Sequence, residues 1–424
     1  MRVLLLTPNA PTPEHVNGGA TRMHRLYRRL IELGNEVTVV TVFTEEQKRF
    51  VGALREDGFA VTEHIRPKSR FWETCSAIAR KPSLIRDALH LSAKEFISDV
   101  FWVDLEPLVR EELEAGDFDV VVIESSFAAF WRADIETDLP VVLVTHEVES
   151  VHLLAKAARI QGVGGFIRYL NGARVRRSEQ EWSVRFDAVV VVSRDEERML
   201  ESIVGTGRLS RTYVVGNGAD LNPVDALPAD PDEMRVLFTG TMAYPPNAVG
   251  AEWLAHEVWP LVLEQEPDAT LAIVGSMPHR STRALDGLPG ISMHADVPDM
   301  QPWFAGASVC TLPMLEGGGT RLKLADAFAA SRAVVSTTNG ATGLECRNGH
   351  ELLIADSAED FARAIVRLLR DSEQRARLGR NGRALVERLY DWNTLGLELS
   401  KCLQDVVASS KTTPIRVVVS DAYA

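Results

Sequence analysis

Two cations and three glycines stand close together in one short run of the chain, Glu316-Gly317-Gly318-Gly319-Thr320-Arg321-Leu322-Lys323. The run follows an apolar segment that ends at Leu312 and leads into an alanine-rich stretch typical of a helix. Glycine amides can approach a ligand closely, and the first turn of a helix adds N–H donors and a favourable dipole. Arg321 can bind two phosphate oxygens at once, and Lys323 adds a point charge. The run therefore predicts a binding site for a nucleotide diphosphate.

The same run resembles the signature of a known family. The sequence GGGTRLK, followed by LADAFAASRAVVSTTNGATGLE, is similar to the donor site of retaining glycosyltransferases with the GT-B fold, in the branch that carries this loop. The resemblance implies that the loop binds the donor and that Asp326 binds the ribose hydroxyls. It assigns these loop residues to donor binding: Glu316, Gly317, Gly318, Gly319 and Thr320.

An acidic pair of the wider family is incomplete in this chain. Many members carry two glutamates here, but Gly318 occupies the position of the first and the second is shortened to Asp326. Glu316 either substitutes for the missing acid or points to solvent, and the sequence favours neither.

The cations that bind the diphosphate in the wider family are also missing from their usual place after the strand that ends at Thr239. Gly240 is followed by the uncharged run TMAYPPN. Charge compensation then falls on Arg321 and Lys323, which we predict to be catalytic because they can stabilise charge on the leaving group. The resemblance also implies that residues at strand ends contact the donor, namely Gly240, Gly275 and Val297.

Two further candidates lie in the first half of the chain. Gly18 and Gly19 precede the first helical pattern, where the family places a similar pair, and we predict that they contact the donor. Arg22, in the following helix, either reaches a donor phosphate or is exposed to solvent, and the second interpretation is favoured. His146 ends the strand expected at 140–145, and we predict that it binds the transferred sugar or relays the acceptor proton. The alternative is a histidine that only pairs with neighbouring carboxylates.

The elements that position these residues alternate regularly. A strand at 3–7, a helix at 20–33 and a strand at 36–43 form a βαβ unit, which implies a parallel sheet. Further strands are expected at 119–123, 140–145, 188–192, 212–215, 235–239, 271–274, 291–294, 308–312, 333–337 and 352–354. Beyond Ala358 the pattern is helical, with breaks expected near Asn381-Gly382 and at Tyr390-Asp391-Trp392.

The alternation changes to a stretch rich in proline and aspartate before residue 234. We therefore predict an α/β fold of two Rossmann-like domains facing across a cleft, the GT-B architecture. The expected parts are an acceptor-side domain at 1–220, a linker at 221–233, a donor-side domain at 234–390, a helix at 391–410 that returns to the first domain, and an unassigned tail at 411–424.

Composition excludes several classes of protein. The 424-residue chain has a net charge of −13, which argues against nucleic acid as a partner. Its four cysteines are widely separated and its first apolar run is too short for a signal peptide, so we expect a cytoplasmic protein. We expect neither metal nor other cofactor, because the D-x-D sequence at Asp230-Pro231-Asp232 lies in the expected linker.

A basic stretch within 151–186 has three interpretations. It contacts an anionic membrane peripherally, guides a phosphorylated acceptor, or forms the charged face of a helix in a soluble enzyme, and the last is favoured. The stretch contains Lys156, Arg159, Arg168, Arg174, Arg176, Arg177 and Arg185.

These features together predict a metal-independent, retaining glycosyltransferase of hexosyltransferase type. Its partners would be a nucleotide-sugar donor such as a UDP-sugar, with uracil or guanine as the base, and an acceptor that is a polysaccharide, a lipid-linked sugar or a small metabolite. Two alternatives are a GT-B-fold sugar-nucleotide epimerase and a non-catalytic nucleotide-sugar binder.

Overall fold

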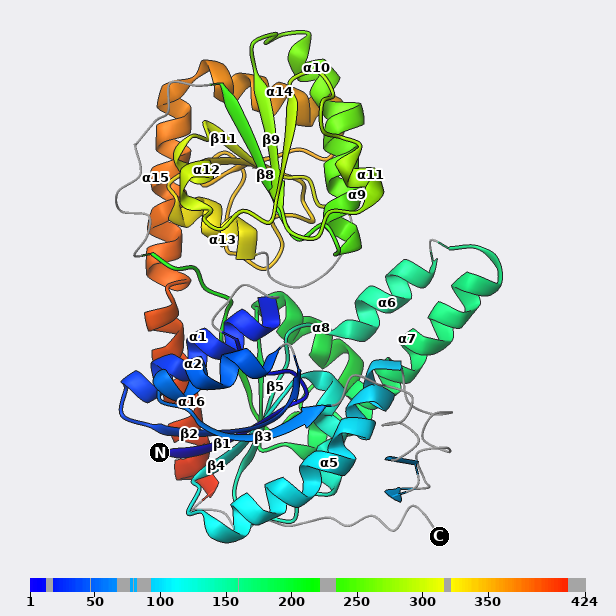
Figure 1. The fold of residues 1–424 in the computed structure, drawn as a ribbon, viewed down its shortest axis with the longest axis vertical. Coiled ribbons are helices and arrows are strands. Elements are labelled where there is room, and N and C mark those ends of the chain that lie inside the picture. Colours follow the sequence, from blue (N-terminus) through cyan, green and yellow to red (C-terminus); the bar gives the residue numbers. More distant parts are fainter. Residues whose placement is uncertain are drawn as a thin grey trace. The chain divides into compact units, whose positions relative to one another are not determined.

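The structure is a computed structural model, and it describes residues 1–12, 18–45, 47–66, 77–78, 80–81, 93–158, 160–221, 234–315 and 322–410. The chain divides into two compact units. Unit 1 comprises Met1–Val215 with Gly396–Ala424, and unit 2 comprises Gly216–Leu395. Each unit is a parallel sheet with helices packed against it (Figure 1).

Among the described residues of unit 1, seven parallel strands form a sheet in the order β3-β2-β1-β4-β5-β6-β7. The interior strands are short runs of buried Val, Leu and Ile, as expected where helices cover both faces. The strands are β1 (Arg2–Thr7), β2 (Glu36–Thr44), β3 (Ala60–Arg66), β4 (Val120–Glu124), β5 (Val141–Val144), β6 (Ala188–Val191) and β7 (Thr212–Val214).

The helices of unit 1 include a long pair, α6 and α7, that projects from the body of the unit (Figure 1). The α-helices are α1 (Gly18–Glu32), α2 (Phe50–Glu56), α5 (Ala93–Ala115), α6 (Glu149–Ala158), α7 (Gly162–Trp182), α8 (Arg194–Val204) and α16 (Trp392–Ser410), the last belonging to unit 1 from Gly396 onward. Short 3-10 helices are η1 (Gln47–Arg49), η2 (Ser126–Ala133) and η3 (Ser183–Arg185).

Within the described part of unit 2, six parallel strands are ordered β10-β9-β8-β11-β12-β13. They are β8 (Arg235–Thr239), β9 (Thr270–Gly275), β10 (Ile291–Ala295), β11 (Val309–Leu312), β12 (Ala333–Ser336) and β13 (Leu353–Ile354). The helices are α9 (Pro245–Trp253), the π-helical η5 (Leu254–Val258), α10 (Trp259–Leu263), α11 (Arg280–Arg283), α12 (Gln301–Ala305), α13 (Leu322–Ala329), α14 (Ala358–Arg370) and α15 (Ser372–Leu389).

The expected α/β class and every expected strand are confirmed, with each strand end within one residue of its predicted place. One strand was missed, because β3 has the sequence AVTEHIR and lacks the apolar run that marks a buried strand. It lies at the edge of its sheet, where side chains are only partly covered.

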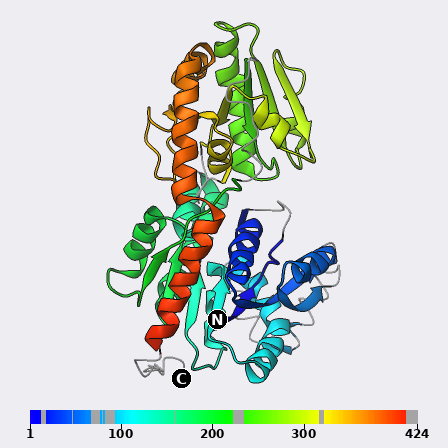
Figure 2. The same ribbon diagram turned by 90° about the vertical axis from the view of Figure 1, so that its left-hand side faces the viewer.

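The helix break expected at Asn381-Gly382 is wrong. Helix α15 runs unbroken from Ser372 to Leu389 beside the sheet of unit 2 (Figure 2). A Cβ atom on Gly382 would lie 2.4 Å from Cδ1 of Phe328 on α13, so this glycine allows close packing of two helices. The second expected break is confirmed, since α15 ends at Leu389 and α16 begins at Trp392.

Candidate active site

Parallel strands of one sheet end on the same side, and we call this side the carboxyl edge of each unit. In unit 2, β8 and β9 approach so closely there that two glycines are required. A Cβ atom on Gly275 would lie 1.9 Å from the carbonyl oxygen of Gly240. A Cβ atom on Gly240 would lie 2.9 Å from both Asn247 Nδ2 and Lys323 Nζ. The structure thus brings Gly240, Gly275 and Lys323 together, as the sequence predicted for one site.

The cation at this edge is held in place by its neighbours. Lys323, in the first turn of α13, donates from Nζ to Asn247 Oδ1 at 2.5 Å and lies 5.4 Å from the centre of the Phe238 ring. Asn247 is buried in α9, and its Nδ2 donates to the carbonyl oxygen of Thr241 at 2.8 Å. Sequence analysis missed Asn247, because an asparagine at the start of a helix is ordinarily assigned to capping.

Asp326 lies one turn beyond Lys323 on α13, so both side chains share a face of the helix. Burial raises the pKa of Asp326 to about 7; the nearby Asp220 adds to this shift, and Lys323 opposes it. Asp220 belongs to a segment of unit 2 that pairs with the chain near Asp391 through an isolated bridge at Ala219. Sequence analysis did not identify Asp220 as a neighbour of Asp326.

The third candidate strand end in unit 2 carries unusual backbone. Asp296 and Met277 both have φ of 52°, in the left-handed region that non-glycine residues seldom adopt. The Asp296 carboxylate accepts from the Met277 amide at 3.1 Å and stabilises this conformation. Val297 follows directly and is partly buried in the core of unit 2. Strain of this kind at a strand end is common at ligand sites.

The predicted donor loop lies outside the described residues. This applies to Glu316, Gly317, Gly318, Gly319, Thr320 and Arg321. Its flanks are described: β11 ends at Leu312 and α13 begins at Leu322.

In unit 1, the predicted His146 follows β5 and belongs to a chain of buried polar contacts. Its Nε2 lies 2.7 Å from Oε2 of Glu124, the last residue of β4, whose side chain is fully buried. The other carboxylate oxygen accepts from the Tyr27 hydroxyl of α1 at 2.8 Å. The His146 side chain is 28% exposed, so Glu124 fixes one edge of the ring while part of it faces water.

The same contacts perturb the neighbouring side chains. Burial raises the pKa of Tyr27 well above its usual range, and the Glu124 carboxylate adds to this shift. Sequence analysis did not identify Glu124 or Tyr27. The only local signal was an acid at the end of the apolar run VVVIE.

The expectation that Arg22 is exposed to solvent is wrong. Its side chain is buried, and Nη2 donates to the carbonyl oxygen of Val215 at 2.7 Å. Burial lowers the pKa of Arg22, and the Glu124 carboxylate opposes that shift. The residue therefore ties α1 to the segment that follows β7. Gly18 and Gly19 begin α1 as expected, and Gly18 is exposed.

Among the described residues, no three His, Cys, Asp or Glu side chains are placed to bind a metal ion together. No helix in that part of the chain is both long enough and apolar enough to cross a membrane. In the described residues, the carboxyl edge of unit 2 offers a lysine and a carboxylate, and that of unit 1 offers a histidine paired with a glutamate.

Comparison with known proteins connects both units to one class. Residues 16–223 match the model described as Glycosyltransferase Family 4, and residues 233–371 match Glycosyl transferases group 1. Sucrose-phosphate synthase from Thermosynechococcus elongatus has a similar fold, with a TM-score of 0.67, 17% identity and coverage of 96% of this chain and 100% of the other. The chain has the GT-B fold of these glycosyltransferases. This GT-B chain also resembles HepE of Anabaena, solved in complex with UDP, with a TM-score of 0.66, 14% identity and coverage of 96% and 100%.

Curated relatives of the GT-B chain match over a shorter length. An uncharacterised 44.6 kDa protein in the cps region of Klebsiella pneumoniae is 29% identical over 166 residues, which is 37% of this chain and 42% of that protein. A GDP-mannose-dependent mannosyltransferase of Corynebacterium glutamicum, which acts on monoacylated phosphatidylinositol monomannoside, is 29% identical over 157 residues, covering 34% and 41%. The match thus spans about two fifths of each relative.

Proposed function

We propose that the chain transfers a hexose from a nucleotide-diphosphate sugar to an acceptor, with retention of anomeric configuration and without a metal ion. The observation that carries this proposal is the position of Lys323. Its amine is held by Asn247 against the close backbone of Gly240, at the carboxyl edge where ligands of parallel sheets bind. Unit 2 is therefore assigned to the donor and unit 1 to the acceptor.

In the proposed reaction, the bond from the anomeric carbon to the diphosphate breaks and a bond to the acceptor oxygen forms. The electron pair of the broken bond stays on the phosphate, so negative charge grows there in the transition state. Lys323 and Arg321 would stabilise that charge, together with amides of the glycine loop. His146, oriented by Glu124, would bind the transferred sugar or take the proton that the acceptor hydroxyl loses.

The proposed donor-binding groups follow from the same edge. Asp326 would accept hydrogen bonds from the ribose hydroxyls, and Val297 with Gly275 would border the base. Gly18 and Gly19 would present amides from the start of α1. UDP is proposed as the nucleotide on the precedent of HepE, which was solved with UDP. The Corynebacterium relative uses GDP-mannose, so GDP is the second candidate. A cytoplasmic location remains a prediction.

The deciding experiment incubates the chain with UDP-glucose or GDP-mannose and a panel of acceptors, before and after treatment with EDTA. We expect a new glycoside whose anomeric configuration, measured by NMR, equals that of the donor, with turnover unchanged by EDTA. An altered sugar nucleotide formed without acceptor would indicate the epimerase, and binding without turnover would indicate the non-catalytic binder. Activity that disappears with EDTA and returns with manganese would contradict metal independence.

A further inference from the structure

Helices α6 and α7 form a hairpin that is anchored at its base and packed along one side. Near the base, the Ser150 hydroxyl donates to the buried Glu179 carboxylate at 2.5 Å. Farther out, a Cβ atom on Gly172 would lie 3.0 Å from Cδ2 of Leu154. At the tip, a Cβ atom on Gly165 would lie 1.9 Å from the carbonyl oxygen of Ile160. The face of α7 that carries these two glycines is therefore covered.

The opposite face of α7 carries an apolar stripe. Val163, Phe166, Ile167 and Leu170 follow the i, i+3, i+4, i+7 spacing that places side chains on one face of a helix. They are exposed by 76%, 61%, 61% and 41% respectively. With Tyr169, they make up five of the twelve large apolar side chains that are exposed in the described part of the chain. An exposed group of this size indicates an interaction surface.

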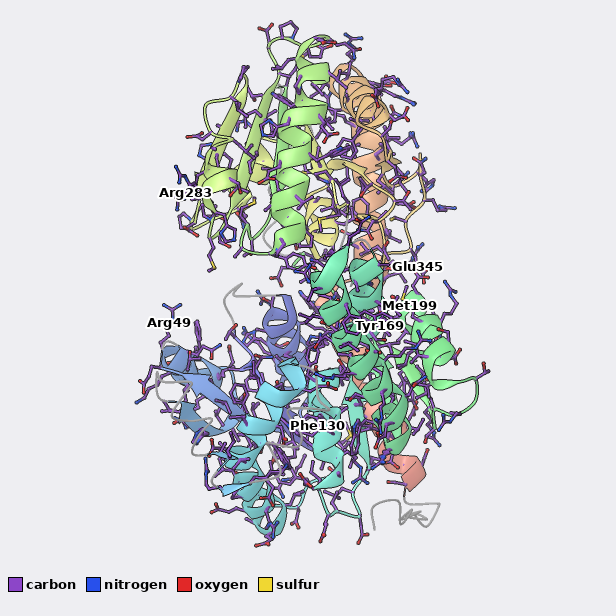
Figure 3. All side chains as sticks on the ribbon, turned by 90° about the vertical axis from the view of Figure 1, so that its right-hand side faces the viewer. Arg49, Phe130, Tyr169, Met199, Arg283 and Glu345 are labelled. Atoms are coloured by element: carbon purple, nitrogen blue, oxygen red, sulfur yellow. The ribbon has the colours of Figure 1, made fainter. Side chains whose placement is uncertain are left out.

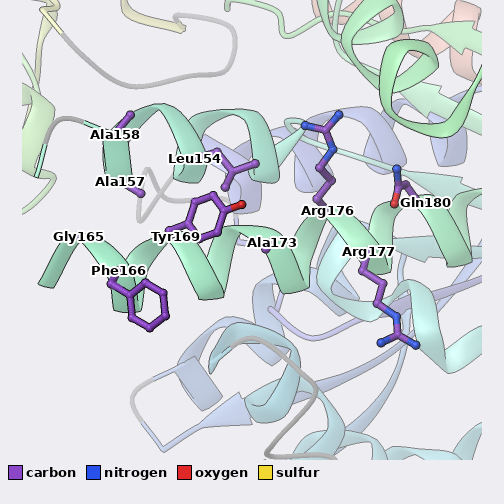
Figure 4. A pocket seen from close by; sticks show the side chains of 10 residues that line it. All are labelled: Leu154, Ala157, Ala158, Gly165, Phe166, Tyr169, Ala173, Arg176, Arg177 and Gln180. Carbon is purple, nitrogen blue, oxygen red and sulfur yellow. The ribbon is translucent and has the colours of Figure 1, made fainter. Parts of the chain in front are cut away.

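The hairpin is also locally basic in an acidic chain. Residues 150–178 contain six Lys or Arg and no Asp or Glu, although the whole chain has a net charge of −13. Arg174 and Arg177 are exposed and continue the face of the stripe toward the base of the hairpin. In Figure 4, Phe166 and Arg177 point away from α6, whereas Tyr169 and Arg176 point toward it. Figure 3 shows the same helix on the face of unit 1 turned to the viewer, with Tyr169 labelled.

The order of these groups along the helix has a physical consequence. Apolar side chains and the exposed Arg168 occupy the tip, and Arg174 and Arg177 follow one to two turns later, roughly 10 Å farther along the axis. An amphipathic helix at a bilayer buries apolar side chains by about 5–10 Å and leaves its cations at the level of the lipid phosphates. A groove of about 620 Å³ that is lined by residues of both helices repeats this order, with Phe166 and Tyr169 near the tip and Arg176 and Arg177 nearer the base.

We propose that the tip of the α6–α7 hairpin docks the protein on a membrane that contains acidic phospholipids. The charge of the hairpin distinguishes between two possible partners of the stripe, a membrane and a second copy of the chain. A second copy of the hairpin would cover the stripe but would give the arginines no anionic partner, because residues 150–178 contain no Asp or Glu. An anionic membrane satisfies the stripe and the arginines at once. The proposal does not depend on the transfer reaction.

The test measures binding of the full chain to vesicles by co-sedimentation. We expect at least tenfold tighter binding to an equal mixture of phosphatidylcholine and phosphatidylglycerol than to phosphatidylcholine alone, and weaker binding in high salt. The stripe variant Phe166→Ser, Ile167→Ser, Leu170→Ser and the charge variant Arg174→Gln, Arg177→Gln should each bind at least roughly tenfold more weakly.

Matched controls change the same residue types on other exposed helices. Ile97→Ser with Leu397→Ser, and Arg380→Gln with Arg388→Gln, should bind as the parent does. The charge variant tests the proposal even if the stripe variant fails to fold, as judged by circular dichroism. Equal binding to both vesicle types, or unchanged binding of a folded variant, would overturn the proposal. So would a dimer in light scattering that the stripe variant dissociates.

Discussion

At the carboxyl edge of unit 1, polar side chains hydrogen-bond one another, whereas at the edge of unit 2 a cation lies against backbone that carries no side chain. Glu124 joins Tyr27 to His146 through contacts of 2.8 and 2.7 Å. In unit 2, the missing side chain of Gly240 leaves room for Lys323, and that of Gly275 lets β9 approach the Gly240 carbonyl oxygen. The first arrangement orients a polar group, and the second admits a ligand close to the backbone. Substitutions should therefore have different consequences at the two edges.

The largest effect is expected for Lys323→Ala. If Lys323 stabilises the leaving phosphate, turnover at saturating donor should fall by about 2.7–4 kcal/mol in the activation barrier, a hundred- to thousandfold. Donor affinity should fall less, since the charge that the lysine meets is greatest in the transition state. Lys401→Ala, on the exposed side of α16, is the matched control. Turnover within a few-fold of the parent would show that Lys323 only supports the helix.

The next effect concerns Asp326 and depends on pH. Burial raises the pKa of Asp326 to about 7, so the carboxylate that we propose as the acceptor of the ribose hydroxyls predominates only above that pH. Affinity for UDP-glucose should therefore rise between about pH 6 and about pH 8. Asp326→Asn should weaken binding by about 1.5–3 kcal/mol above pH 7 and remove the pH dependence. Calorimetry across this pH range tests the prediction. If the affinity of the variant rose equally steeply with pH, the titrating group would not be Asp326.

The same pKa has a consequence for stability in the absence of ligand. The folded state holds a proton on Asp326 at pH values where the unfolded carboxyl, with its ordinary value of 3.8, has lost it. The contribution of this proton to the free energy of unfolding is therefore fully present below about pH 4 and is lost as the pH rises toward about 7. Thermal melts of Asp326→Asn should lack this decline.

Gly275→Ala tests how strictly the unit 2 edge requires glycine. The new methyl group would meet the Gly240 carbonyl oxygen at 1.9 Å, and backbone cannot yield as a flexible side chain does. We expect a loss of about 1–3 kcal/mol in the free energy of unfolding, with loss of donor binding. Gly52→Ala is the control, because no atom lies within 4 Å of the added carbon and the helix α2 should gain about 0.5–1 kcal/mol. Equal denaturation midpoints for both variants would show that the close approach of β8 and β9 does not require glycine at position 275.

The contrast between the two edges also explains what the sequence could predict. Buried parallel strands are short apolar runs, so their positions were read to within one residue, whereas the polar edge strand β3 was missed. Gly240 and Gly275 were selected through the family resemblance, and the structure shows that both lie where two strands approach closely. Gly382 misled because the same residue type permits either a helix break or close packing.

Residues that act through distant partners gave no such signal. Lys323 meets Asn247 across 76 positions of the chain, and Tyr27 meets Glu124 across 97. Pairing over such separations is fixed by the packing of strands and helices, and no spacing in the sequence encodes it. Arg22 was misassigned for the same reason, because its acceptor, the Val215 carbonyl, lies 193 positions away.

Glu124→Gln examines the unit 1 edge and should have the smallest effect. Glutamine keeps the shape and can still accept from the Tyr27 hydroxyl, but it removes the charge that lies against His146. The histidine would lose its preferred orientation, and we expect turnover to fall roughly tenfold, or about 1.4 kcal/mol. Donor affinity should fall less than turnover, because the groups proposed for the diphosphate and the ribose, Lys323 and Asp326, lie in unit 2. Glu181→Gln, a partly exposed acid at the end of α7, is the control.

Kinetics with saturating donor, together with the pH profile of kcat/KM, would test the assignment. A fall in donor affinity equal to the fall in turnover would mean that Glu124 supports the fold rather than the orientation of His146.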